Sequence, residues 1–136
     1  MAKLFPAFVL TVFFAVALSL VACGGGSSSR QLLSVMVTPA TAIASDFPNG
    51  MVQFTATGTY DRSPSPATVN PANWGLAPSD TYPMDAVSFS PSGVAQCKTG
   101  FAGTVTVQGG GFGCPSNPKM GIPCHEVFGT AQMTCP

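Results

Sequence analysis

The chain has 136 residues, of which only 7% are charged, and its five basic and five acidic residues give a formal net charge of zero. Nucleic-acid binding needs clustered Lys and Arg that neutralise phosphates, and this composition provides no such cluster. The same scarcity of basic residues leaves no polybasic patch for anionic lipids. The composition therefore argues against nucleic acid as a partner, and the length suits a single domain.

The first segment of the chain is apolar. Lys3 supplies a positive charge, residues 4–21 are almost entirely apolar, and the small Ala22 stands just before Cys23. The length of this segment fits either an export signal or a membrane-spanning helix. The abrupt change to Gly and Ser after Cys23, without a positively charged stop signal, favours a cleaved export signal. An uncleaved membrane anchor is the alternative.

The run Leu20-Val21-Ala22-Cys23, followed by glycine, resembles the lipobox of bacterial lipoproteins. This resemblance implies that residues 1–22 are a signal peptide and that Cys23 becomes the first mature residue, with lipid on its thiol and acylation of its amino group. Each buried methylene contributes about 0.8 kcal/mol, so two or three acyl chains anchor a protein stably where one does not.

The residue after the cysteine bears on localisation. The family's signal for retention at the inner membrane would place Asp there, and this chain has Gly24. By that resemblance we expect the bacterial outer membrane, with the periplasmic or surface face left open. Residues 23–31 would then be a lipidated cysteine with a flexible Gly/Ser tether, and residues 32–136 would be the folded domain.

From residue 32 onward the pattern is that of β-strands. Leu33, Val35 and Val37 alternate with Ser34 and Met36 until Pro39 ends the run, and residues 46–50 are rich in turn formers. The clearest alternation places the apolar residues Val52, Phe54 and Ala56 on one face of a strand that extends to position 60. Polar residues alternate with them on the other face. We expect this strand to be half-buried, as in a sandwich.

The second half of the domain continues with short strands. Residues 61–72 contain three prolines and are expected to form a loop before Trp74, the only tryptophan. We expect Trp74 to anchor the core between sheets, and a ligand-stacking platform is the alternative. Four further strands are predicted from β-branched and alternating patterns: 86–89, 93–99, 104–107 and 127–134.

The segments VMVTPATAIA, GMVQFTATGTY, AVSFSPSGVAQC and GTVTVQG, with the tryptophan between them, resemble a bacterial immunoglobulin-like domain of group 2 over about residues 32–110. The resemblance implies an all-β, immunoglobulin-like β-sandwich of about seven short strands, of the kind used as adhesive or spacer modules in exported proteins. The proline-rich loop departs from the pattern. So does the cysteine-bearing segment 109–136, which we expect to be a disulfide-stabilised C-terminal extension.

Four cysteines remain once Cys23 is assigned to lipid, and an even number in an exported domain indicates disulfides. Three pairings are possible. We favour Cys97–Cys135, because both lie on predicted strands that could be sheet neighbours, and Cys114–Cys124, because these two flank a short loop. The loop-closure relation gives about 4 kcal/mol for the first bond and about 3 kcal/mol for the second.

A zinc site is the competing interpretation of this region. Three thiolates and an imidazole could in principle bind zinc: Cys114, Cys124, Cys135 and His125. However, no CxxC or HxxxH spacing is present, and the exported compartment oxidises thiols. We therefore expect no metal and no cofactor. His125 is the only histidine, no GxSxG motif occurs, and the carboxylates are scattered, so we expect no enzymatic activity. A small exported hydrolase is a remote alternative.

These features together predict a lipid-anchored, non-catalytic module of the cell envelope with a binding, adhesive or structural role. Its partners would be the membrane, through the lipid at Cys23, and an envelope protein or polysaccharide. An envelope-assembly or accessory subunit of a larger complex is the alternative. Aromatic side chains are the candidates for ligand contact: Trp74, Tyr82, Phe47, Phe101 and Phe112.

Overall fold

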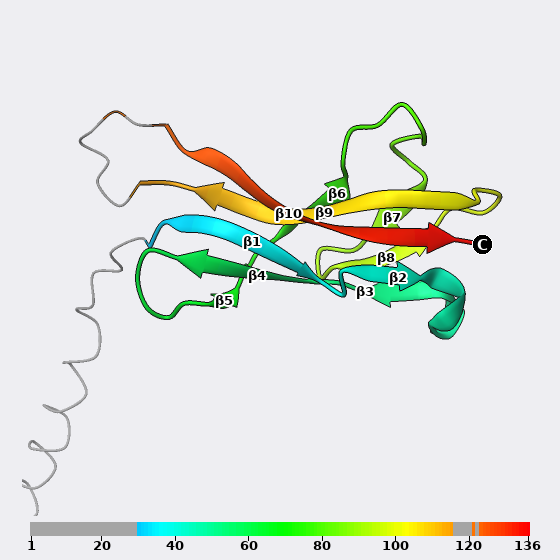
Figure 1. Cartoon of the computed structure of the whole chain (residues 1–136), viewed down its shortest axis with the longest axis horizontal. Coiled ribbons are helices and arrows are strands. Elements are labelled where there is room, and N and C mark those ends of the chain that lie inside the picture. Colours follow the sequence, from blue (N-terminus) through cyan, green and yellow to red (C-terminus); the bar gives the residue numbers. More distant parts are fainter. Residues whose placement is uncertain (1–29, 116–120, 122) are drawn as a thin grey trace, which may run out of the picture.

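The computed structural model describes residues 30–115, 121 and 123–136. This part of the chain forms the all-β sandwich predicted from the sequence (Figure 1). Its strands are β1 (Leu32–Thr38), β2 (Thr41–Ile43), β3 (Met51–Gln53), β4 (Thr55–Tyr60), β5 (Ala67–Thr68), β6 (Asn73–Leu76), β7 (Val87–Phe89), β8 (Val94–Cys97), β9 (Gly103–Gly113) and β10 (His125–Cys135). Two short 3₁₀ turns, η2 (Ala44–Asp46) and η3 (Pro48–Gly50), occupy the predicted turn region. The predicted signal peptide and Cys23 lie outside the described residues.

One layer of the sandwich is the sheet β2–β10–β9–β6. Its centre is the hairpin of β9 and β10, which are antiparallel and pair along all eleven residues of each strand. Both strands are longer than predicted, because the glycines at 109–111 continue β9 instead of ending it. Ala131 and Met133 of β10 are buried, so the disulfide-bearing C-terminal segment is built into the sandwich.

The second layer consists of the sheets β1–β4–β5 and β3–β8–β7. Val52, Phe54 and Ala56 are buried as predicted, at 0%, 1% and 1% exposure. The sequence indicated one strand here, but the run divides at Phe54: β3 pairs with β8, whereas β4 pairs with β1. At the division the Phe54 N–H donates to the Gly93 carbonyl at 2.8 Å, outside either ladder. The chain thus passes from one sheet to the other without a turn.

The start of β1 differs from the predicted alternation. The pairing of β1 with β4 shifts register between Leu32 and Ser34. An irregularity of this kind changes the face on which the preceding side chains lie. Leu32 is therefore buried at 3% exposure, while Leu33, which was expected to face inward with Val35 and Val37, is 52% exposed.

Close contacts within and between the layers depend on glycines of the β9–β10 hairpin: Gly109 lies against Trp74 of its own sheet, and Gly113 and Gly129 lie against β1 of the other layer. A Cβ atom placed on Gly109 would lie 2.3 Å from the Trp74 ring, and one on Gly113 would lie 2.5 Å from the Leu32 carbonyl oxygen. On the neighbouring strand β10, a Cβ on Gly129 would lie 2.4 Å from the Val35 carbonyl oxygen. Only glycine permits such approaches of backbone and ring. We call Gly109, Gly113 and Gly129 the glycine floor.

Trp74 of β6 joins the two parts of the core. The larger cluster is centred on buried residues of β3, β9 and β10 and on Phe54, whose ring centroid lies 6.5 Å from that of Trp74. The smaller cluster contains Leu32, Ala56 and Val69. The half-buried Trp74 side chain packs against both clusters. It is therefore a core anchor, as the sequence favoured.

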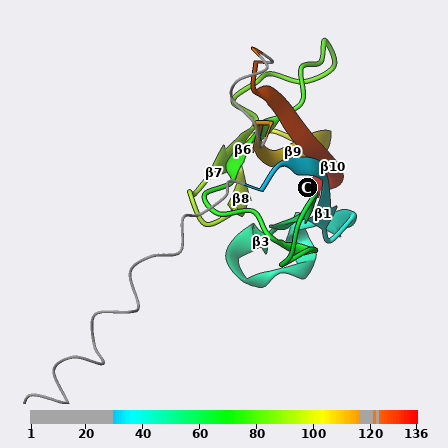
Figure 2. The same ribbon diagram turned by 90° about the vertical axis from the view of Figure 1, so that its left-hand side faces the viewer.

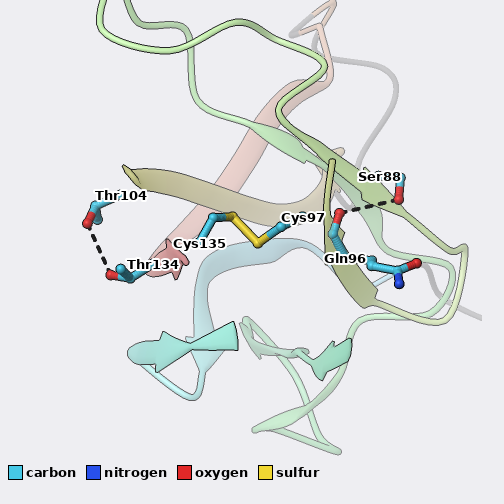
Figure 3. The surroundings of a disulfide bond; sticks show 6 residues. All are labelled: Ser88, Gln96, Cys97, Thr104, Thr134 and Cys135. Atoms are coloured by element: carbon cyan, nitrogen blue, oxygen red, sulfur yellow. Dashed lines mark hydrogen bonds between the residues drawn. A yellow bond between two sulfur atoms is a disulfide. The ribbon is translucent and has the colours of Figure 1, made fainter. Parts of the chain in front are cut away.

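Both disulfides have the pairing that was predicted from the sequence. Cys97 ends β8 and Cys135 ends β10, and their Cα atoms are 5.8 Å apart (Figure 3). These strands belong to different sheets, so the bond crosses between the layers and does not join sheet neighbours as expected. Cys114 and Cys124, with Cα atoms 4.2 Å apart, form the next pair across the hairpin after the last pair of the β9–β10 ladder.

The glycine floor yields a stability prediction. Gly109→Ala places a methyl group against the Trp74 ring, and overpacking of this kind lowers the free energy of unfolding by about 1–3 kcal/mol. Gly75→Ala on the neighbouring strand β6 is the matched control, because nothing lies within 4 Å of its Cβ position. Urea unfolding followed by circular dichroism measures both. Equal stability of the two variants would contradict this account of β9.

The two disulfides should contribute unequally. Replacing Cys97 and Cys135 by alanine removes the bond between layers, with a sequence separation of 38, and should lower the unfolding free energy by about 4 kcal/mol. Replacing Cys114 and Cys124, with a separation of 10 in a hairpin already closed by its ladder, should cost about 3 kcal/mol or less. Urea midpoints compare the pairs, and a larger loss for the hairpin pair would refute the ranking.

Candidate functional site

The five aromatic residues proposed for ligand contact lie in different parts of the molecule. Tyr82 is buried; its hydroxyl donates to the Ala77 carbonyl at 2.9 Å and accepts from the Thr106 N–H at 3.2 Å. Phe47 and Phe101 are half-buried and pack against the larger core cluster. Phe112 is exposed near the C-terminal end of β9, whereas Phe101 lies just before the start of that strand. The five residues therefore do not form one binding surface.

Trp74 is the member of this set that lines a hollow with chemically suitable neighbours. Two shallow depressions, of about 280 and 340 Å³, both include Ala72, Trp74 and Pro91 in their walls. We call the two together the Trp74 groove. Its remaining lining residues lie in or next to β4, β5, β6 and the β7–β8 connection, and all are uncharged: Phe54, Thr55, Ala56, Thr68, Val69, Asn70, Asn73, Phe89, Ser90 and Ser92.

Hydrogen bonds hold the β7–β8 turn in place beside Trp74. The Gly93 N–H donates to the Ser90 carbonyl at 3.0 Å, and the Val94 N–H donates to the Ser90 hydroxyl at 3.0 Å. Gln53 donates its side-chain amide to the Ser92 carbonyl at 2.8 Å. Gly93 has a φ of +87°, and a Cβ there would lie 2.5 Å from the Phe54 carbonyl oxygen, so glycine is required. One wall of the groove is thus fixed before any ligand arrives.

Some polar groups of the groove lack a partner in the described structure, whereas the Ser90 and Ser92 hydroxyls bond to each other at 2.9 Å. Within the described part of the chain, the indole N–H of Trp74 has no hydrogen-bond partner, and the side chains of Asn70 and Asn73 have none either. No side-chain nitrogen or oxygen in that part is both fully buried and without a partner, so the indole N–H is at least partly accessible to solvent. An indole edge among hydroxyl and amide groups, without charge, suits a neutral polar ligand with an apolar face.

A further depression, of about 350 Å³, lies near the C-terminus and includes Lys98, Phe101 and Pro136 in its walls. Its cation is already paired, because the Lys98 ammonium donates to the Asp85 carboxylate. That hydrogen bond, and then the charge of Lys98, lower the pKa of Asp85. Both side chains are well exposed to solvent. This surface ion pair occupies the charge that a ligand would use, so the depression is a weaker candidate than the Trp74 groove.

The cysteines considered for zinc binding are committed to disulfide bonds. All four cysteines of the domain are in disulfides, so none can offer a thiolate. Among the described residues no group of three or more His, Cys, Asp and Glu side chains could hold a metal ion. His125 is exposed at the start of β10, opposite Gly113. The glycines at 109–111 lie within a strand, which rules out a phosphate-binding loop there.

Comparisons with known proteins assign no family to this chain. No protein-family model matches the chain, and no curated protein matches it. Within the described residues, no helix is both long enough and apolar enough to span a membrane. The function must therefore be inferred from the N-terminal sequence, the fold and the Trp74 groove.

Proposed function

We propose that this protein is a lipid-anchored, non-catalytic module of the bacterial cell envelope, with an immunoglobulin-like domain that binds or positions another envelope component. The observation that carries the proposal is the run of apolar residues ending in Val21-Ala22-Cys23, followed at once by Gly and Ser. Cleavage before Cys23 would leave a thiol and an amino group for acyl chains. The folded domain begins only a few residues later.

The strand order supports the immunoglobulin-like part of this proposal. In the constant-type immunoglobulin fold, strands C, F and G form one sheet and strands A, B, E and D form the other. Here β6, β9 and β10 correspond to C, F and G, while β1, the β3–β4 run, β8 and β7 correspond to A, B, E and D. The disulfide between β8 and β10 departs from antibody domains, where strands B and F are joined.

The short tether favours a role close to the membrane. Residues 23–29 separate the proposed lipid from the first described residue, and seven residues reach at most about 25 Å when fully extended. A domain held so near the bilayer meets other envelope components at high local concentration. Binding or spacing needs no catalytic group, and this fits a domain with scattered, exposed carboxylates.

The chemistry of the Trp74 groove favours a polysaccharide as the bound component. Sugar rings have hydroxyl groups that bond to indole N–H, amide and hydroxyl groups, and apolar faces that can contact the exposed edge of an aromatic side chain. The groove combines an indole with Thr, Ser and Asn side chains and contains no charged residue. A highly charged protein or nucleic-acid partner would find no complementary charge there. We therefore assign neutral glycans as the ligand class.

Mass spectrometry of the protein from growing bacteria tests the anchor. The mature chain should begin at Cys23 and carry two or three acyl chains, and it should partition with membranes. Cys23→Ser removes the thiol and should abolish acylation, because no other side chain at that position accepts the diacylglyceryl group. An unmodified Cys23 still joined to residues 1–22 would overturn the proposed anchor.

The fluorescence of Trp74 tests the groove directly, because it is the only tryptophan in the chain. Titration with neutral oligosaccharides should shift the Trp74 emission, and a polyanionic glycan of equal length should not. Thr68→Ala in the groove should weaken binding about fivefold by removing one hydrogen bond. Thr41→Ala, an exposed threonine on the distant edge strand β2, is the control and should bind normally. Absence of a shift with every neutral glycan would exclude the ligand class.

A further inference from the structure

The described chain begins beside the loop end of the β9–β10 hairpin, where the Cys114–Cys124 disulfide follows the last pair of the ladder. The Leu32 carbonyl lies where a side chain on Gly113 would lie, 2.5 Å from the Cβ position. Figure 1 shows the start of β1 and the end of β9 at one end of the elongated sandwich and the C-terminus at the other, and Figure 2 looks at the molecule from the first of these ends. We call the end that carries Arg30, Phe112 and the Cys114–Cys124 disulfide the anchor end.

Phe112 is the most exposed large apolar side chain of the anchor end, at 59% exposure. Its outward position follows from the alternation of β9, because Gly111 and Gly113 on either side of it face Leu32. Across the ladder its partner is Glu126, which is also exposed. Leu33, exposed by the irregularity at the start of β1, adds a second apolar group at the same end.

Charge at the anchor end balances among the described residues. Arg30 lies 3.8 Å over the Tyr60 ring and donates to the Pro64 carbonyl. Arg62 pairs with Asp61 at 3.6 Å. With Glu126 included, the described residues of this end carry two positive charges, on Arg30 and Arg62, and two negative charges, on Asp61 and Glu126. An attraction of this end to a surface would therefore be apolar and would not depend on anionic lipid or on low salt.

A short tether would keep the anchor end, where the described chain begins, near the bilayer. Seven residues span at most about 25 Å, whereas an eleven-residue hairpin is about 36 Å long. Acyl chains on Cys23 would therefore keep the anchor end near the lipid. The other end of β9 lies one hairpin length from the anchor end. Phe112 lies two residues from Cys114, about 7 Å along the strand, and so belongs to this end.

We propose that the anchor end is a membrane-contact surface and that Phe112 inserts into the interface of the bilayer to which the protein is attached. This inference rests on the proposed lipid at Cys23 and adds to it an orientation of the domain. The occupant of the exposed apolar surface is the lipid interface itself. The contact would hold the anchor end against the membrane and leave the side walls, including the Trp74 groove, facing the surroundings.

The test uses the mature lipoprotein in phosphatidylcholine vesicles whose acyl chains carry bromine, which quenches nearby indoles. Phe112→Trp should gain an emission that is blue-shifted and quenched, at both low and high salt, after subtraction of the Trp74 signal. Met84→Trp is the matched control: Met84 is 57% exposed and precedes Asp85, which pairs with Lys98 away from the anchor end. Its added emission should remain unquenched.

Flotation of the vesicles, with mass spectrometry of Cys23, separates the possible outcomes. Acylated protein that floats and shows quenching only for Phe112→Trp supports the inference. Acylated protein that floats without quenching of that variant overturns the membrane contact and leaves the anchor intact, and Phe112 would then face another protein. Unacylated protein that does not float overturns the anchor, and the inference falls with it.

Discussion

The domain is organised by the absence of side chains along one hairpin. The glycine floor lets the backbone of β1 and the indole of Trp74 reach positions that any Cβ atom would occupy. Hydrophobic sandwiches usually separate their layers by interdigitating side chains, about 10 Å apart. Here the layers meet backbone to glycine at one end and through Phe54, Met133 and the valines of β9 at the other. The interlayer disulfide closes that second end.

This arrangement explains why the candidate groove lies where it does. Trp74 is held between Gly93 and Gly109, so its ring is fixed by the core while its N–H edge remains at the surface. A rigid aromatic group loses little conformational entropy when it binds a ligand. Core packing and ligand binding are therefore compatible uses of one residue, and the two interpretations weighed for Trp74 in the sequence need not compete.

Local patterns in the sequence were sufficient for much of the fold. The alternation around Phe54 predicted its burial, and the Pro91–Gly93 turn lies between β7 and β8 as expected. The patterns misjudged Leu33, because a register shift depends on the partner strand and leaves no trace in alternation. They also treated the glycines at 109–111 as a boundary. Glycine is a weak strand former in isolation, and its place in β9 is justified only by what packs on it.

The sequence by itself indicated the all-β class, favoured the observed one of three possible cysteine pairings and raised the expectation of a lipid at Cys23, since these depend on residue type and order along the chain. Only the tertiary structure decided that Cys97 and Cys135 join opposite layers and that Phe112 lies exposed while Tyr82 is buried. It also brought Thr68, Trp74 and Pro91 into one groove. These relations join residues that are far apart in the sequence. They are determined by strand order and register, which arise from packing across the core.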